Sequence, residues 1–233
     1  YYSGIYATKT DDGNQLNWKL VGHLPEPLAY GVTVTCDNSM IVVGGMNNDG
    51  SYGKVYRVTL VDGKAEVSTL PSMPCSVDNM AGTLVGKHLY IAGGAMDGKA
   101  SNRVLRLDLD NISAGWKDIK SFPGMVRVQP VAGCMGDNRF CLFGGFAPAA
   151  NGEEAKLSMD GCVYDETTDE WELVEGPKDD QGEPLFVGGG TGINLTKDKL
   201  LEMGGVNKDV FLSAVNHPQP AYLSHPIEWY RFN

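Results

Sequence analysis

The sequence has 233 residues, of which 42% are hydrophobic and 21% are charged, and it contains 30 glycines. That length suits one large all-β domain or two small ones, and the glycine content predicts a chain rich in turns and sheet. The formal net charge of −10 argues against nucleic acid and anionic membrane surfaces as partners, because both reward clustered Lys and Arg. No apolar run approaches the roughly 18 residues that a membrane-spanning helix needs, so no membrane span is expected.

The chain starts at Tyr1 without an initiator Met or a signal-peptide pattern, which predicts a processed, trimmed or excerpted chain. Its five cysteines are odd in number and form no C-x-x-C motif. Four of them lie in apolar strand-like runs and are expected to be small buried thiols, namely Cys36, Cys134, Cys141 and Cys162.

The predicted strands recur in a unit of about fifty residues. A Gly-Gly pair follows an apolar strand-length run four times, as IVVGG, YIAGG, CLFGG and LEMGG, ending at Gly45, Gly94, Gly145 and Gly205. The spacings between the pairs are 49, 51 and 60 residues. Glycine suits such strand ends because it accepts positive φ and lets neighbouring backbones approach closely.

Further strands follow each of the first three pairs. The first of these strands reads KVYRVTL, RVLRLDL and GCVYDE in the three units. The strand after it carries, in the same order, Val67, Trp116 and Trp171. The first residues fit the end of the same unit, with SGIYAT followed by NWKLVG and Trp18. The large side chains are expected to pack between neighbouring units, where burying one of them contributes roughly 1.5–3 kcal/mol.

A period near fifty is typical of the kelch β-propeller, in which each repeat forms one four-stranded antiparallel blade. The fold class is therefore predicted to be all-β and kelch-type. We expect a single domain over 1–233, with a partial blade at 1–22, complete blades at 28–72, 76–122 and 126–176, and a partial blade at 184–233. The two partial segments could close on each other as a four-bladed ring, but part of a larger propeller is preferred. A sandwich or barrel would not repeat the order of Gly-Gly, aromatic strand and Trp.

Ligands of propellers usually meet loops at one end of the central channel. The positions just before the innermost strand and just after the second are therefore candidates for a binding rim: Tyr30, Asn47, Asp78, Asn79, Met96, Arg127, Gln129, Phe146 and Asn207. Each has an alternative role. Tyr30 could pack between blades, Asn207 could satisfy its own turn, and Asp78 could cap a turn rather than act as a base.

Three stretches resemble the bacterial N-acetylneuraminate epimerases, or sialic-acid mutarotases, in the branch whose blades are cyclically permuted. They are YYSGIY with NWKLVGHLPEPLAYGVTV, then FPGMVRVQPVAGCMGDNRFCLFGG, and finally GGVNKDVFLSAVNHPQPAYLSHPIEWYRFN. The resemblance implies a six-bladed parent, of which this chain would supply about four blades. It also implies interconversion of the α and β anomers of sialic acid, a sugar-acid substrate, a periplasmic location, and no metal or organic cofactor. The last stretch would hold a family insertion at the rim, between the second and third strands of a blade.

The resemblance implies substrate-binding roles for Arg127, Gln129 and Asn207. Arg127 matches the family's Pro-Arg-x-Gln stretch, except that Met125-Val126 replace Gly-Pro, and it is the preferred group for the substrate carboxylate. A salt bridge at the surface or between blades is the alternative. One departure matters. The family's Gly-Glu-x-Lys-Pro-Gly-x-Arg-Thr motif, with its proposed catalytic glutamate, does not occur in this sequence. The catalytic residues are therefore unassigned, and a non-catalytic kelch module that binds a protein or glycan remains the alternative function.

Other chemistries find little support. His217 and His225 stand eight residues apart without further ligands, which is not a zinc spacing. The run GGGTG at Gly188–Gly192 lacks the Lys and Ser/Thr of a phosphate loop. A kelch-type copper oxidase would need a Tyr-Cys pair and His ligands in matching places, and none is visible.

Overall fold

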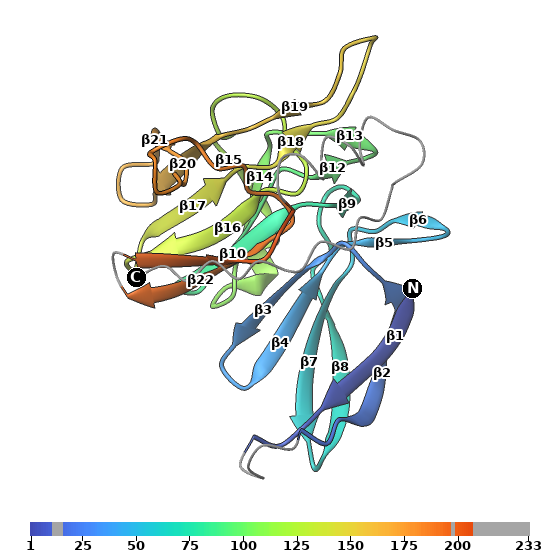
Figure 1. The fold of residues 1–233 in the computed structure, drawn as a ribbon. Helices are drawn as coiled ribbons and strands as arrows, with labels where there is room; N and C mark the ends of the chain where they lie inside the picture. Colours follow the sequence, from blue (N-terminus) through green and yellow to red (C-terminus); the bar gives the residue numbers. More distant parts are fainter. Residues whose placement is uncertain (11–15, 197–198, 207–233) are drawn as a thin grey trace.

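The computed structural model describes residues 1–10, 16–196 and 199–206, and the fold of this part is all-β (Figure 1). Three four-stranded antiparallel sheets share one strand order, in which the first strand of each sheet is innermost and the last is outermost. The first sheet is β3 (Val32–Cys36), β4 (Ser39–Val43), β7 (Val55–Val61) and β8 (Lys64–Leu70). The second is β10 (Ala81–Val85), β11 (His88–Ala92), β14 (Val104–Asp108) and β15 (Lys117–Ile119). The third is β16 (Val131–Met135), β17 (Arg139–Phe143), β20 (Asp160–Asp165) and β21 (Glu170–Glu175).

A two-stranded sheet lies on each side of these three. At the start of the chain, β1 (Tyr2–Ala7) pairs with β2 (Lys19–Leu28), and after the third sheet β22 (Thr191–Thr196) pairs with β23 (Lys199–Met203). The inner strands follow one another in chain order, because β3 contacts β10, β10 contacts β16, and β16 contacts β22. Four-stranded sheets with adjacent inner strands are the arrangement of kelch-type propeller blades, as the repeat predicted.

The strand β2 is longer than the sequence predicted. The expected partial blade ended at residue 22, whereas β2 continues to Leu28 and pairs there with Tyr2. The pairing shifts register between Tyr2 and Gly4, opposite the segment that contains Pro25 and Pro27. Proline has no N–H to donate to a ladder, so an irregular register lets the strand continue past these two residues.

Short strands gather at the end of the sheets that the Gly-Gly pairs mark, and we call this end the rim. They are β5 (Met46–Asn47), β6 (Gly50–Ser51), β9 (Val77–Asp78), β12 (Ala95–Met96), β13 (Lys99–Ala100), β18 (Phe146–Ala147) and β19 (Lys156–Leu157). The second glycine of each pair has positive φ, and a side chain there would strike neighbouring backbone. A Cβ on Gly94 would lie 2.5 Å from the carbonyl oxygen of Asp78, and one on Gly145 would lie 2.7 Å from that of Val128. These contacts confirm why glycine ends the second strands.

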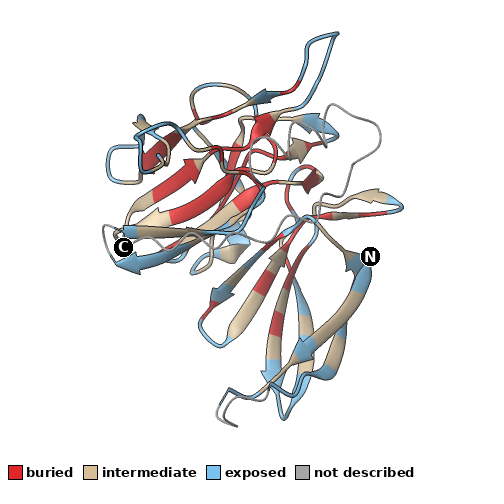
Figure 2. Ribbon diagram, in the orientation of Figure 1, coloured by how far each residue is buried: buried red, intermediate tan, exposed pale blue. Residues whose placement is uncertain are grey.

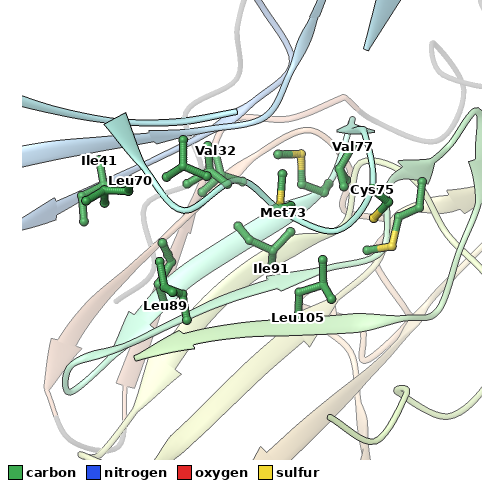
Figure 3. Close-up of a cluster of buried hydrophobic side chains, with 14 of the residues drawn as sticks. Val32, Ile41, Leu70, Met73, Cys75, Val77, Leu89, Ile91 and Leu105 are labelled. Atoms are coloured by element: carbon green, nitrogen blue, oxygen red, sulfur yellow. The ribbon is translucent and has the colours of Figure 1, made fainter. Parts of the chain in front are cut away.

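Apolar side chains fill the space between neighbouring sheets. One cluster joins the first and second sheets and includes Ile41, Leu89 and Leu105 (Figure 3). A second cluster joins the second and third sheets through Tyr90, Phe140 and Tyr164. Figure 2 shows that burial concentrates in the second and third sheets, while β1 and β2 are intermediate or exposed.

The tryptophans of the repeat also link neighbouring sheets. The indole N–H of Trp116, between the 3-10 helix η1 (Ile112–Ala114) and β15, donates to the Pro71 carbonyl at 2.8 Å. That of Trp171 donates to the Lys120 carbonyl at 2.8 Å. Each bond reaches back to the preceding sheet, as the sequence predicted. Trp18 differs, because 62% of its surface is exposed.

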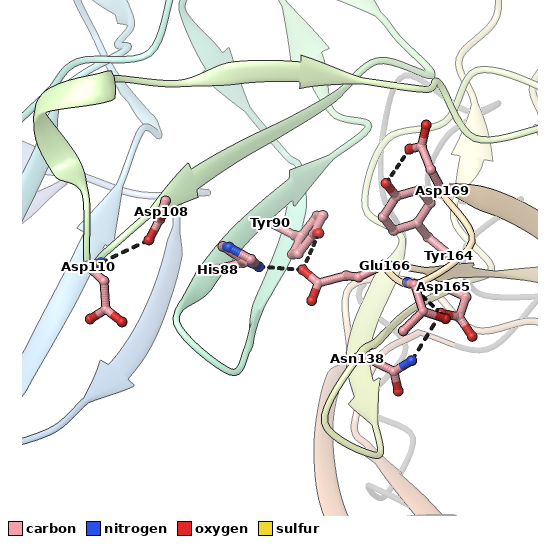
Figure 4. Close-up of polar contacts among 10 residues, drawn as sticks. His88, Tyr90, Asp108, Asp110, Asn138, Tyr164, Asp165, Glu166 and Asp169 are labelled. Carbon is pink, nitrogen blue, oxygen red and sulfur yellow. Dashed lines mark hydrogen bonds and ion pairs between the residues drawn. The ribbon is translucent and has the colours of Figure 1, made fainter.

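The end of the sheets opposite the rim carries a polar link between the second and third sheets (Figure 4). The Glu166 carboxylate accepts a hydrogen bond from the Tyr90 hydroxyl at 2.5 Å and lies 2.6 Å from His88 Nδ1. Burial, together with the Glu166 carboxylate, raises the pKa of the Tyr90 hydroxyl well above its ordinary range. The tyrosine therefore stays a neutral donor in this link.

All five cysteines are free thiols. Cys36, Cys141 and Cys162 are buried as predicted, whereas Cys134 is only half-buried. Burial raises the pKa of the Cys141 and Cys162 thiols to about 12, so they behave as small apolar groups. In the part of the chain that the structure describes, no helix has the length and apolar character needed to cross a membrane.

Candidate functional site

Three predicted rim residues occupy the same place in successive sheets. Tyr30, Asn79 and Gln129 each stand two residues before an innermost strand, and their φ angles are 59°, 52° and 52°. Gly189 takes the same place before β22, with φ of 68°. Positive φ is uncommon for residues other than glycine, so its recurrence marks a shared local geometry.

Backbone hydrogen bonds join these four positions into a chain along the rim. The Asn79 N–H donates to the Tyr30 carbonyl at 2.9 Å, and the Gln129 N–H donates to the Asn79 carbonyl at 2.7 Å. The Gly189 N–H then donates to the Gln129 carbonyl at 2.9 Å. The residues that the spacing grouped as rim candidates are therefore neighbours in space, although about fifty residues separate them in the sequence.

A side-chain network accompanies this backbone chain. The Gln129 Nε2 donates to Asn79 Oδ1 at 3.0 Å, and the Asn79 Nδ2 donates to Asp78 Oδ1 at 2.7 Å. The Ser51 hydroxyl donates to the other Asp78 oxygen. Asp78 is only 6% exposed, whereas Asn79 and Gln129 are half-buried. The network thus runs from a buried carboxylate to an amide at the surface.

The side chain of Tyr30 is 56% exposed, so it does not pack between sheets as its alternative role required. It borders a pocket of about 350 Å³ between the sheet of β1 and β2 and the first four-stranded sheet. The pocket lining also includes Tyr2, Tyr6, Met40 and Val42. Tyr30 therefore presents an aromatic surface at this pocket, and its backbone carbonyl ties it to Asn79 along the rim.

Arg127 lies deeper than its predicted role as a carboxylate-binding group requires. Its side chain is fully buried, and Nη1 lies 3.1 Å from Asp160 Oδ1 and donates to the Gly144 carbonyl at 3.1 Å. The guanidinium also stacks 5.2 Å from the Phe122 ring centre, while Nη2 is buried without a partner among the described residues. A cation that is enclosed and paired in this way is not accessible to a substrate carboxylate. The ion pair joins two residues of the same predicted blade, 126–176, so it also differs from an ion pair between blades.

The other rim candidates serve the fold or lie outside the described residues. Asn47 is buried, and its amide bonds the Pro27 carbonyl, the Asp49 N–H and the Tyr52 hydroxyl. Met96 and Phe146 are also buried, at 7% and 8% exposure. Asn207, together with His217 and His225, lies outside the described residues.

Sequence reasoning missed one titratable group, Glu202 on β23. Burial raises the pKa of its carboxyl to about 7, which lets it take and release a proton near neutral pH. Glu202 stands three residues before the second glycine of its Gly-Gly pair, where the other units have Val42, Ile91 and Leu142. A carboxylate at this otherwise apolar position was the signal that could have found it.

The described residues offer hydrogen-bonding groups rather than a cluster of metal-ligating side chains. Among them, no group of three or more His, Cys, Asp or Glu side chains is placed to hold a metal ion. The rim instead offers amides, a hydroxyl and an aromatic face. Such groups make hydrogen bonds and stacking contacts with a polar organic ligand such as a sugar.

Comparisons with known proteins agree on one family. A family model described as N-acetylneuraminate epimerase matches residues 70–220. An N-acetylneuraminate epimerase of Haemophilus influenzae is 31% identical over 147 residues, which cover 63% of this chain and 36% of that protein. One from Yersinia enterocolitica is 29% identical over 148 residues, covering 63% of this chain and 35% of that protein.

Two further comparisons concern the repeat and the fold. A Kelch domain-containing protein of Vibrio cholerae is 26% identical over 179 residues, covering 70% of this chain and 48% of that protein. The solved structure of YjhT superimposes with a TM-score of 0.67 at 15% identity, covering 92% of this chain and 69% of that one. The chain therefore spans less than half the length of these curated relatives, and its fold is that of a kelch-type propeller.

Proposed function

Since the chain belongs to the N-acetylneuraminate epimerase family, we propose that it forms part of an enzyme that interconverts the α and β anomers of N-acetylneuraminate. The reaction class is an isomerisation in carbohydrate metabolism, and the substrate is a sugar acid. The observation that carries this proposal is the linked rim of Tyr30, Asn79 and Gln129. It supports the proposal because it gathers amide and aromatic groups from successive sheets at one surface.

The chemistry of mutarotation sets what the whole site must supply. The sugar ring opens when the anomeric hydroxyl loses a proton and the ring oxygen gains one, and it closes again by the reverse steps. A carboxyl group that both accepts and donates a proton suits this task. The family's glutamate motif does not occur in this sequence, so we assign binding rather than proton transfer to the rim residues.

In the proposed complex, Asn79 and Gln129 hydrogen-bond the polar groups of the sugar, and the Tyr30 ring covers one of its apolar edges. Because Arg127 is enclosed and paired with Asp160, the substrate carboxylate requires another partner. A periplasmic location is also proposed, and it rests only on the family resemblance. Cell fractionation with periplasmic and cytoplasmic marker enzymes would test it.

Proton NMR tests the proposed activity directly. Freshly released α-N-acetylneuraminate converts slowly to the β anomer in buffer, and the full-length protein is expected to accelerate this conversion. Gln129→Ala is expected to slow the catalysed conversion by about tenfold, because it removes a hydrogen bond at the rim. Asp49→Asn, a change of an exposed residue on the neighbouring β5–β6 turn, serves as the matched control.

The same experiment separates the two candidate functions. Acceleration supports the epimerase. Binding of N-acetylneuraminate without acceleration would instead support a non-catalytic kelch module, and it would overturn the proposed reaction.

A further inference from the structure

The rim network fixes which way each of its amides points. The Asp78 carboxylate has only acceptor atoms, and Ser51 already donates to Oδ2. The Asn79 atom that lies 2.7 Å from Asp78 Oδ1 must therefore be the donor Nδ2. The buried carboxylate thus selects one of the two orientations of the Asn79 amide.

The orientation of the Asn79 amide in turn fixes the orientation of the Gln129 amide. With Nδ2 directed at Asp78, the Asn79 Oδ1 faces Gln129, and the Gln129 atom 3.0 Å away must be Nε2. The Gln129 Oε1 then receives no hydrogen bond from any described residue. Gly189 lies beside this oxygen, because a Cβ built there would stand 3.7 Å from Oε1, and a glycine at this place adds no side chain to cover it.

We propose that Asp78 is a positioning residue that acts through Asn79 to present the Gln129 carbonyl oxygen, rather than its NH₂ group, to the ligand. The proposal rests on the rim being the ligand site of the proposed function. It adds a rule of specificity. The ligand group opposite Gln129 is a hydrogen-bond donor, such as a sugar hydroxyl or an amide N–H, and neither a carboxylate nor an ether oxygen suits this position.

Reversing the chain of hydrogen bonds tests the proposal. In Asp78→Asn, the new amide can donate to Asn79 Oδ1, so Asn79 turns its Nδ2 toward Gln129 and Gln129 turns its Nε2 toward the ligand. In Gln129→Glu, one carboxylate oxygen still faces the ligand as an acceptor. The other carboxylate oxygen now faces Asn79 Oδ1, which is also an acceptor, so no hydrogen bond forms between them. Each single variant is expected to bind N-acetylneuraminate about threefold to tenfold more weakly than the wild type, measured by calorimetry on the full-length protein.

The double variant Asp78→Asn with Gln129→Glu restores a consistent order. The new amide at position 78 donates to the Asn79 Oδ1, and the Asn79 Nδ2 donates to the new carboxylate at position 129. The second oxygen of that carboxylate then accepts from the ligand. The affinity of the double variant is expected to return to within about twofold of the wild type, a strong departure from additivity. If the two losses simply add, the proposal is overturned.

A measurement without ligand separates this proposal from the proposed function. In the wild type, a side-chain NH₂ proton of Gln129 is bonded and exchanges slowly with water in ¹⁵N NMR spectra, whereas in Asp78→Asn it should exchange rapidly. Asn79→Ala gives the same readout without changing the buried carboxylate, and Asp49→Asn should change nothing.

Slow exchange in both Asp78→Asn and Asn79→Ala would refute the positioning role, whatever the binding data show. A wild-type protein that does not bind N-acetylneuraminate would refute the proposed function and the specificity rule together. The amide spectra would still decide the positioning role in that case.

Discussion

Two interfaces between neighbouring sheets use different chemistry. Between the second and third sheets, aromatic rings meet in the core: Tyr90 stacks on Phe140 with ring centres 5.1 Å apart, and its ring centre lies 5.9 Å from that of Tyr164. Between β2 and the first four-stranded sheet, the Glu26 carboxylate instead bonds Lys54 at 2.5 Å and the Tyr56 hydroxyl at 2.6 Å. The first interface has an enclosed aromatic core beside its polar link through Glu166, whereas the second is held at its edge by ionic and polar contacts.

The difference shows that the repeat supplies aromatic side chains but that neighbours decide whether they are buried. On β1, Tyr2 and Tyr6 are 90% and 59% exposed within the described part of the chain, and Trp18, just before β2, is 62% exposed. Tyr90 and Tyr164, in contrast, are almost completely buried between two four-stranded sheets. The apolar interface should therefore dominate stability, and variants at matched residue types can test this.

The largest effect is expected from Phe140→Ala. Phe140 is fully buried and contacts Tyr90 and Trp171, so its removal should lower the free energy of unfolding by about 3–5 kcal/mol. Tyr6→Ala, on the exposed sheet, should change it by no more than about 0.5 kcal/mol. Urea denaturation followed by fluorescence measures both. Equal losses at the two sites would contradict the comparison.

The next effect concerns Glu202 on β23, which stands where the other units have an apolar residue. Because burial raises its pKa to about 7, the unfolded chain ionises this carboxyl at lower pH than the folded protein does. Wild-type stability should therefore fall as the pH rises from about 4.5 to 7, by about 1–2 kcal/mol from this group.

Glu202→Gln should remove that decline, so the free energy of unfolding of the variant should rise relative to that of the wild type as the pH rises. Thermal unfolding at pH 4.5 and pH 8 makes the measurement. A variant whose stability relative to the wild type is the same at both pH values would exclude this role for Glu202.

A smaller effect is expected from Trp171→Phe. Phenylalanine keeps most of the apolar contact but loses the hydrogen bond to the Lys120 carbonyl, which should cost about 1 kcal/mol. Trp18→Phe should be neutral within error, because the Trp18 side chain is largely exposed. Denaturation curves of the two variants compare their stabilities. A larger loss of stability in Trp18→Phe would contradict the expectation that the interface between the second and third sheets contributes more to stability.

The smallest effect is expected from Glu26→Gln at the polar interface. Burial acts to raise the pKa of Glu26, but hydrogen bonds from Lys54 and Tyr56 outweigh it, and the net shift is downward. The stabilisation is therefore present above the ordinary glutamate pKa and is lost as the pH falls below it. Glu26→Gln should cost about 0.2–1 kcal/mol at pH 7 and almost nothing at pH 3. A constant difference across this range would show that ionisation of Glu26 is not involved.

Much of the fold was predictable because its signals are local. The Gly-Gly pairs reflect positive φ and close backbone contact, and the alternating strands between them predicted the four-stranded sheets. The common spacing of Tyr30, Asn79 and Gln129 also placed them correctly on one rim, because repeated units put equivalent residues in equivalent places.

The role of Arg127 could not be read from its position before a strand. Its burial depends on Asp160, more than thirty residues away in the sequence, and on Gly124, whose missing side chain leaves room beside the guanidinium. The length of β2 was likewise hidden, because a shift of register lets the strand continue past Pro25 and Pro27. Such long-range pairings have no local signature.

The backbone chain from Tyr30 to Gly189 has a consequence for how this surface can change. Each turn is anchored by the peptide group of the adjacent repeat, and residues as different as Tyr, Asn, Gln and Gly occupy the same place. The backbone chain therefore accepts different side chains, provided that they tolerate positive φ. Exchanging side chains at these four points should alter ligand preference while leaving the architecture intact, so they form a natural set for a substitution library.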